Sequence, residues 1–161
     1  MNEREFFLER RGVEFGAFDR VIGALPRDKF EFRPHERSQS ARELVWTLTG
    51  ETLGCIEMIK AGRVDWQAQP PAGTPAELVS GFQETYKALS KRAAAVDEKA
   101  WQRKVQFLVG GKVMQEPTLG QFLWFLFFDS IHHRGQLSTY IRPMGGKVPS
   151  IYGPSGDDPG T

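Results

Sequence analysis

The sequence has little of what several classes of protein require. Its single cysteine, Cys55, cannot form a disulfide within the chain and excludes every zinc site built from cysteines. Basic residues number 21 and acidic residues 20, so the net charge of +1 excludes the strongly basic surface typical of nucleic-acid binding. The longest apolar run, Phe122–Phe128, is far shorter than the roughly 20 residues that span a bilayer. We therefore expect a soluble cytoplasmic protein with neither a nucleic-acid nor a membrane partner.

Apolar residues recur at helical spacing in four segments of the chain. These segments are Glu3–Leu25, Ser40–Ala61, Thr74–Val96 and Thr118–Ile141. The second begins with Ser40 and Glu43, which fit a capping box, and the third with a threonine, a proline and an acid in the order typical of a helix start. The remaining residues 147–161 form a tail rich in glycine, proline and aspartate, in which Ile151 and Tyr152 are candidates to dock onto the body.

Between the third and fourth segments the pattern is less regular. Val105, Phe107 and Val109 occupy alternate positions, and Gly110-Gly111 can turn the chain back onto Val113. This pattern fits either a short β-hairpin or an ordered loop.

Four helices of about 20 residues in a chain of this length predict one domain over residues 1–161, an all-α four-helix bundle. The first two connections have about 13 residues each, and a loop of that length extends to about 40 Å. A 20-residue helix is about 30 Å long, so neighbouring helices are free to run parallel.

The most informative segment is 129–136, because it combines an aspartate and a histidine on one face of the last helix. Asp129 and His133 are four residues apart and therefore lie one turn above each other. A carboxylate oxygen and an imidazole nitrogen are suitable ligands for Zn, Ni, Mn or Fe. The alternative is that Asp129 only accepts a hydrogen bond from His133 and orients it. His132 points about 100° away, as expected for a surface residue.

The second helix offers further ligands if it faces the last one. Thr47 and Glu51 are four residues apart and flank its apolar stripe. Glu51 is then placed to complete a site with Asp129 and His133. The alternative is that Glu51 faces solvent or pairs with an arginine, as glutamates on helices usually do.

Two segments resemble the DinB/YfiT-like family, namely residues 127–158, with their His-His-Arg-Gly-Gln run and Tyr-Gly-Pro tail, and residues 40–51. The order of the elements is also similar, so the resemblance covers nearly the whole chain. It implies a four-helix bundle of metalloenzymes, often homodimeric, whose members include thiol-dependent S-transferases.

The resemblance also implies where a metal would be held. In the family one histidine comes from the second helix and two from an H-x-x-x-H pair on the last helix. Carried over, these positions are Thr47, Asp129 and His133, of which only His133 keeps the family's residue type. Aspartate is a plausible substitute ligand, whereas a neutral threonine hydroxyl is a poor one. We therefore expect a degenerate divalent-metal site.

Two functions follow as hypotheses. The first is a metal-dependent transferase or hydrolase, in which Arg134 or Tyr140 orients an anionic substrate. The second is a non-catalytic dimeric relative that binds a small molecule or acts as a scaffold and has lost the metal. For each of the two residues a structural alternative exists, an ion pair with an acid for Arg134 and a hydrogen bond from the hydroxyl to the backbone for Tyr140.

Overall fold

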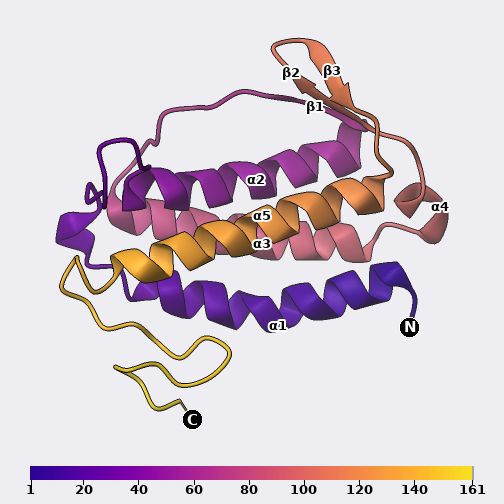
Figure 1. Ribbon diagram of the computed structural model, residues 1–161. Coiled ribbons are helices and arrows are strands. Elements are labelled where there is room, and N and C mark those ends of the chain that lie inside the picture. The colour runs from indigo at the N-terminus through magenta and orange to yellow at the C-terminus, as the bar shows by residue number, and fades with distance from the viewer. Residues whose placement is uncertain (161) are drawn as a thin grey trace.

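The computed structural model describes residues 1–160 and contains four long helices. They are α1 (Glu3–Gly23), α2 (Ala41–Ala61), α3 (Pro75–Ala94) and α5 (Leu119–Tyr140) (Figure 1). Each begins with a capping box, in which the side chain of the cap residue and the side chain three residues later satisfy each other's backbone N–H groups. The four cap residues are Asn2, Ser40, Thr74 and Thr118. The predicted four-helix bundle is confirmed.

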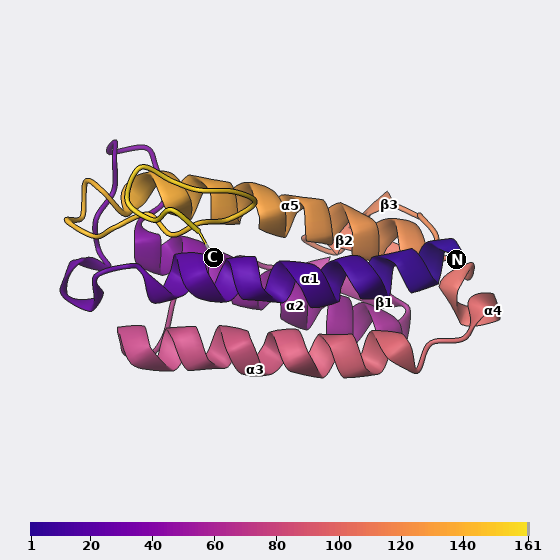
Figure 2. The same ribbon diagram turned by 90° about the horizontal axis from the view of Figure 1, so that it is seen from below.

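The helices run in two directions. α1 and α5 point one way, whereas α2 and α3 point the other way (Figures 1 and 2). α2 packs against α3 and α5, and α1 packs against the same two helices. The neighbours α2 and α3 are therefore parallel, which the long connection between them allows. α2 and α5, the second and the last of the long helices, are antiparallel neighbours and face each other.

A small sheet covers one end of α2. It consists of β1 (Arg63–Trp66), β2 (Gln106–Val109) and β3 (Lys112–Gln115) in the order β1-β2-β3. β2 and β3 form the hairpin, and its turn uses Gly110 and Gly111 at φ of 58° and 78°, a conformation that favours glycine at both positions. β1 pairs with β2 in parallel, which the sequence did not indicate, because its partner lies about 40 residues away.

Two single-turn helices, η1 (Arg27–Lys29) and α4 (Glu98–Trp101), complete the fold. The tail after α5 lies against α1 and α5 (Figure 2). Arg20 donates hydrogen bonds to the carbonyl oxygens of Ser150 and Ile151, and Tyr152 donates one to Glu14 at 2.9 Å. The predicted docking of the Ile151-Tyr152 pair is confirmed, while Thr161 lies outside the described residues.

A close contact between α4 and α5 yields a first stability prediction. A Cβ atom at Gly120 would lie 2.2 Å from Nε1 of Trp101, whose side chain is fully buried. The indole has no room to withdraw, so Gly120→Ala is expected to lower the free energy of unfolding by about 1–3 kcal/mol. Urea denaturation measures the loss. Gly81→Ala, at a helical glycine with nothing within 4 Å, is the control and is expected to leave stability unchanged or raised.

Candidate metal centre and cavity

The facing helices α2 and α5 bring three potential ligands together. Glu51 projects from α2, and Asp129 and His133 project from successive turns of α5. One ligand atom from each residue lies within 4.8 Å of the other two. The Nε2 atom of His133 is 3.3 Å from Glu51 Oε1 and 3.7 Å from Asp129 Oδ2. The predicted convergence of these three side chains is therefore present in the structure.

Glu51 is a buried carboxylate. Only 2% of the residue is exposed, so it does not face solvent, and its partner is a histidine rather than an arginine. Ser130 donates a hydrogen bond to Glu51 Oε2 at 2.6 Å, which leaves Oε1 directed at His133. Burial raises the pKa of Glu51, and the hydrogen bonds from His133 and Ser130 only partly offset that rise.

His133 is oriented by its other ring nitrogen. Its Nδ1–H donates to Gln136 Oε1 at 2.8 Å, so Nε2 is the atom that faces the two carboxylates. Burial alone would lower the pKa of His133, but the hydrogen bonds and charges of Glu51, Gln136 and Asp129 raise it to about 9. Asp129 Oδ2 is 3.7 Å away, which is beyond hydrogen-bond distance. Orientation of His133 by Asp129, the alternative interpretation of this pair, is therefore not what the structure shows.

The donor set fits a divalent cation. Two ligands at about 2.1 Å from a tetrahedral ion lie about 3.4 Å apart, and the His133–Glu51 and His133–Asp129 separations of 3.3 and 3.7 Å bracket that value. Two carboxylates and one imidazole supply two negative charges when the imidazole is neutral, which balances a divalent ion. In addition, two of the three ligands are held by hydrogen bonds to neighbouring side chains, Glu51 by Ser130 and His133 by Gln136.

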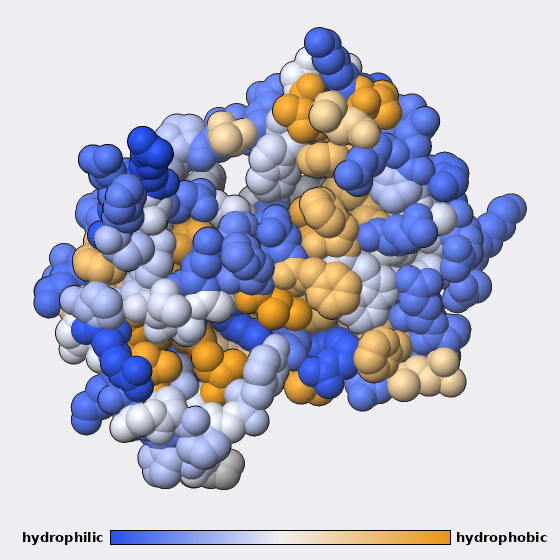
Figure 3. Space-filling model, in the orientation of Figure 1, coloured by the Kyte–Doolittle hydropathy of each residue, from blue (hydrophilic) through white to orange (hydrophobic). Residues whose placement is uncertain are grey.

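The three side chains open onto a large cavity of about 990 Å³. Its walls are α2, α5, the strands β1 and β2, and the loop of residues 67–71, which crosses above α2 (Figure 1). Figure 3 shows the opening beneath this loop. Trp46 donates from its indole nitrogen to the carbonyl oxygen of Gln69 at 2.8 Å and so ties the loop to α2.

The remaining residues singled out from the sequence lie elsewhere in the fold. Thr47 lines the same cavity, but its hydroxyl donates to the Glu43 carbonyl oxygen at 2.9 Å and accepts from the Gln39 side-chain amide at 3.2 Å. Arg134 is turned away, towards Glu14 of α1, in a buried ion pair. Tyr140 donates to the Gln39 carbonyl oxygen at 3.0 Å. Arg134 thus forms the ion pair, and Tyr140 the backbone hydrogen bond, that were the alternatives to substrate binding. Neither residue lines the cavity.

Sequence reasoning missed three residues that shape the site. Ser130 holds Glu51, and its position next to Asp129 gave no sign of that role. Gln136 fixes His133 from one turn further along α5, a spacing that a search for i, i+3 partners would have found. Trp66 lies over α2, since a Cβ at Gly54 would be only 3.5 Å from its ring, and its place depends on the unpredicted strand β1.

The fold and the site together define a class, a four-helix bundle with a carboxylate–histidine centre between its second and last long helices. The chain belongs to the DinB family, whose pattern matches residues 7–159. Among curated relatives, the chain is 23% identical to YrdA of Bacillus subtilis (strain 168) over 164 residues, which cover 96% of this chain and 90% of YrdA.

Solved structures agree with this assignment at the level of the fold. A DinB-like protein from Bacillus cereus superposes with a TM-score of 0.76 at 16% identity, covering 92% of this chain and 97% of that one. YfiT from Bacillus subtilis superposes with a TM-score of 0.70 at 11% identity, covering 88% and 87%. YfiT is described as a probable metal-dependent hydrolase with an unusual four-helix bundle topology. As for membrane association, none of the helices within residues 1–160 combines the length and the apolar character that a bilayer crossing requires.

Proposed function

We propose that the protein binds a divalent metal ion through Glu51, Asp129 and His133 and acts as a metal-dependent hydrolase or transferase on a small molecule. The observation that carries the proposal is the convergence of three ligand atoms within 4.8 Å at the wall of a cavity large enough for a substrate. The oxygen and nitrogen donors suit Zn, Ni, Mn or Fe. The description of YfiT as a probable metal-dependent hydrolase supports the same chemistry in the family.

The protein's own residues would hold and orient the reacting groups. A metal ion bound here would lower the pKa of a bound water or thiol and stabilise negative charge. Ser130 keeps Glu51 in place, and Gln136 keeps the imidazole of His133 turned towards the carboxylates. The loop of residues 67–71 forms the outer wall of the cavity.

Turnover measured with and without metal tests the proposal. Protein purified without an affinity tag is compared before and after EDTA treatment on a panel of chromogenic esters and amides and of thiol acceptors. We expect turnover that requires the metal and that disappears in His133→Ala. Glu57→Gln is the matched control, because it removes another α2 carboxylate that lines the same cavity but lies outside the cluster. Metal-loaded protein without activity on any member of the panel would contradict the proposal.

One observation favours a second candidate, a non-catalytic relative that binds a small molecule without a metal. His133, with its pKa raised to about 9, is cationic at neutral pH and lies against Glu51 and Asp129. The imidazolium therefore offsets one of the two negative charges of the cluster without a metal ion. Protein that is free of metal after native purification and takes up none on dialysis against Zn²⁺ or Mn²⁺, yet keeps its fold, would support this candidate.

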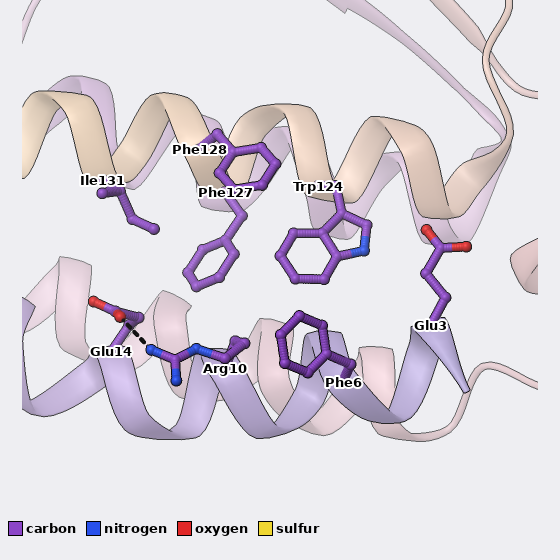
Figure 4. Close-up of a pocket in the computed structure, with 8 residues that line it drawn as sticks. All are labelled: Glu3, Phe6, Arg10, Glu14, Trp124, Phe127, Phe128 and Ile131. Atoms are coloured by element: carbon purple, nitrogen blue, oxygen red, sulfur yellow. Dashed lines mark hydrogen bonds and ion pairs between the residues drawn. The ribbon is translucent and has the colours of Figure 1, made fainter. Parts of the chain in front are cut away.

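We also propose that the protein forms a homodimer through an aromatic groove between α1 and α5. The groove has a volume of about 440 Å³, and Figure 4 shows Phe6 of α1 opposite Trp124 and Phe127 of α5. Phe6 is 44% exposed and Phe128 is 62% exposed. Large aromatic side chains gathered at the surface are typical of protein interfaces rather than of a monomer's exterior.

The dimer gives a prediction that light scattering can check. We expect a mass of twice the chain's 18.2 kDa, and we expect Phe128→Asp to yield the monomer, because a charge would be buried without a partner. Val113→Asp is the control, since Val113 is similarly exposed at 47% but lies on β3. A wild-type mass of one chain at all concentrations would contradict the proposal.

A further inference from the structure

One half of the large cavity is apolar, and it adjoins the candidate metal centre. On α5, Phe125 and Leu126 both line the cavity and lie one turn before Asp129. On α2, Gly54 lies one turn after Glu51, and a Cβ there would be 3.9 Å from Cδ1 of Leu126. The apolar half therefore begins one helical turn from the ligand cluster. Its large side chains are those of Leu53, Val64, Trp66, Phe107, Phe125 and Leu126.

Trp66 gives the apolar half a flat wall. Its six-membered ring lies against α2, since a Cβ at Gly50 would be 3.7 Å and one at Gly54 3.5 Å from ring carbons. The two glycines lie on the helical turn that carries the glutamate ligand. Val64 and Phe107 are partners in the register of β1 and β2, and their side chains lie on the same face of the sheet as Trp66. The sheet thus covers this part of the cavity with aromatic and aliphatic side chains.

Two side chains of the apolar half are left uncovered by the rest of the protein. Leu53 of α2 and Phe125 of α5 line the cavity, and each is half-exposed. A cavity lined by apolar and aromatic side chains next to a few convergent polar groups is typical of a small-molecule site. An apolar group bound here would remove that surface from water, and an aromatic group would in addition pack against the rings of Trp66 and Phe125.

The charges around the apolar half favour an uncharged ligand group. Among residues 1–160, no lysine or arginine lines the cavity. Glu57 pairs with Lys60 at 3.7 Å, and Asp65 accepts a hydrogen bond from the backbone N–H of Gly111 at 3.0 Å. Asp65 also precedes Trp66 in the same strand, so the two side chains point to opposite faces of the sheet. A charged group packed against Trp66 would therefore lose its hydration without gaining a partner.

We infer that the apolar half binds an uncharged aromatic group of the substrate, which packs against Trp66 and Phe125 and places the neighbouring bond at the metal centre. The inference rests on the proposed function, because it takes this cavity as the substrate site. One helical turn rises about 5.4 Å, and a pair of methylene groups between a ring and a carbonyl spans that distance. The substrate class is therefore arylalkyl acyl compounds, that is, their esters, thioesters or amides, and Trp66 is a specificity-determining residue.

Binding of 3-phenylpropionamide, an uncharged molecule with this spacing, tests the inference. The protein is labelled with 5-fluorotryptophan, and ¹⁹F NMR follows its four tryptophans, each assigned from its phenylalanine variant. We expect the Trp66 signal to shift saturably at millimolar probe, both in protein as purified and after EDTA treatment, because the ring packs against side chains and not against the metal. Trp124 lines the groove between α1 and α5 and Trp101 is fully buried, so their signals report binding elsewhere and are expected to stay in place. Propionamide, which lacks the ring, is expected to leave the Trp66 signal unchanged.

Variants assign the probe to the apolar half. Phe125→Ala is expected to weaken the affinity read from the Trp66 titration by about threefold to tenfold, because one of the two aromatic packing partners is lost. Met114→Ala is the control, since Met114 is an exposed apolar residue on β3 and does not line the cavity. We expect Met114→Ala to bind the probe as tightly as the wild type.

The inference is overturned if the Trp66 signal stays in place in one or both forms, if the Trp124 or Trp101 signal shifts as much, or if propionamide has the same effect. It is also overturned if Phe125→Ala binds as tightly as the wild type or no more weakly than Met114→Ala. Metal content and turnover are measured separately on the same protein. Protein that lacks metal yet shows the Trp66 shift would refute the proposed function alone, whereas metal-dependent turnover without the shift would refute this inference alone.

Discussion

His133→Ala is expected to lower the affinity of the protein for its divalent ion by more than about a hundredfold. His133 provides the only nitrogen among the three converging ligands, and its Nε2 atom lies between the two carboxylates. Loss of an outer-shell partner alone typically costs about 10–100-fold in metal affinity, and loss of a direct ligand costs more. Competition with a chromogenic chelator measures the affinity.

The neighbouring residue provides a matched control for this experiment. His132 is exposed on α5, and His132→Ala removes the same side chain without touching the cluster. We expect its metal affinity to equal that of the wild type. Gln136→Ala is expected to give an intermediate loss of about 10–100-fold, because it frees the imidazole to turn without removing it. Equal affinities for wild type and His133→Ala would place the metal elsewhere.

Arg134→Met is expected to lower the free energy of unfolding by about 3–5 kcal/mol, the largest stability effect predicted for this chain. Arg134 and Glu14 are each 2% exposed and form an ion pair between α5 and α1. Tyr152 of the tail donates to the same carboxylate, and Arg10 pairs with it at 2.9 Å. Removal of Arg134 leaves a buried carboxylate without its main partner, and urea denaturation measures the cost.

Two further variants distinguish the stability lost by leaving Glu14 unpaired from the stability lost by removing an exposed arginine. Arg142→Met is the matched control, because Arg142 forms an exposed pair with Asp157 at 2.8 Å, and such pairs contribute about 0–1 kcal/mol. The double variant Glu14→Gln/Arg134→Met is expected to regain part of the stability, since no charge is then buried alone. A double variant less stable than Arg134→Met would contradict this account.

The Glu14–Arg134 pair also predicts that the contribution of Glu14 to stability changes with pH in opposite directions in the wild type and in Arg134→Met. Burial alone would raise the pKa of Glu14, but hydrogen bonds from Arg134, Tyr152 and Arg10 hold it below its ordinary value. In the wild type the contribution of Glu14 is therefore present above the pKa of the unfolded chain and is lost as pH falls through the lower pKa of the folded state. In Arg134→Met, burial should raise that pKa, so the deficit relative to wild type should be largest at pH 7 and smaller near pH 4.

The four helices were predictable because local signals agreed with one another. The pairs Ser40–Glu43 and Thr74–Glu77 marked the starts of two helices, and the apolar residues recurred at helical spacing. The sequence alone did not decide between a hairpin and a loop after the third helix, because one alternating segment and a Gly-Gly turn fit both. β1 gave no signal, because a four-residue strand shows almost no periodicity and its parallel partner is remote in sequence.

The candidate site was predictable in part, because two of its three residues are close together in the sequence. Asp129 and His133 share a helix, so their spacing alone placed them together. Glu51 needed the additional assumption that the second and last helices face each other, which the packing of α2 against α5 supports. The partner of Arg134 was not predictable, since no local pattern relates α5 to Glu14, 120 residues earlier in the chain. The position of Trp66 was not predictable either, because Trp66 belongs to β1, a strand that the sequence did not indicate.

The most direct test of the metal centre is the position of the ion itself. Crystals grown with Zn²⁺ or Mn²⁺ would be measured on both sides of the absorption edge of the metal. The account predicts one anomalous peak within about 2.0–2.5 Å of Glu51 Oε1, an Asp129 carboxylate oxygen and His133 Nε2. A peak bound by other residues, or fully loaded protein with no peak between α2 and α5, would contradict it.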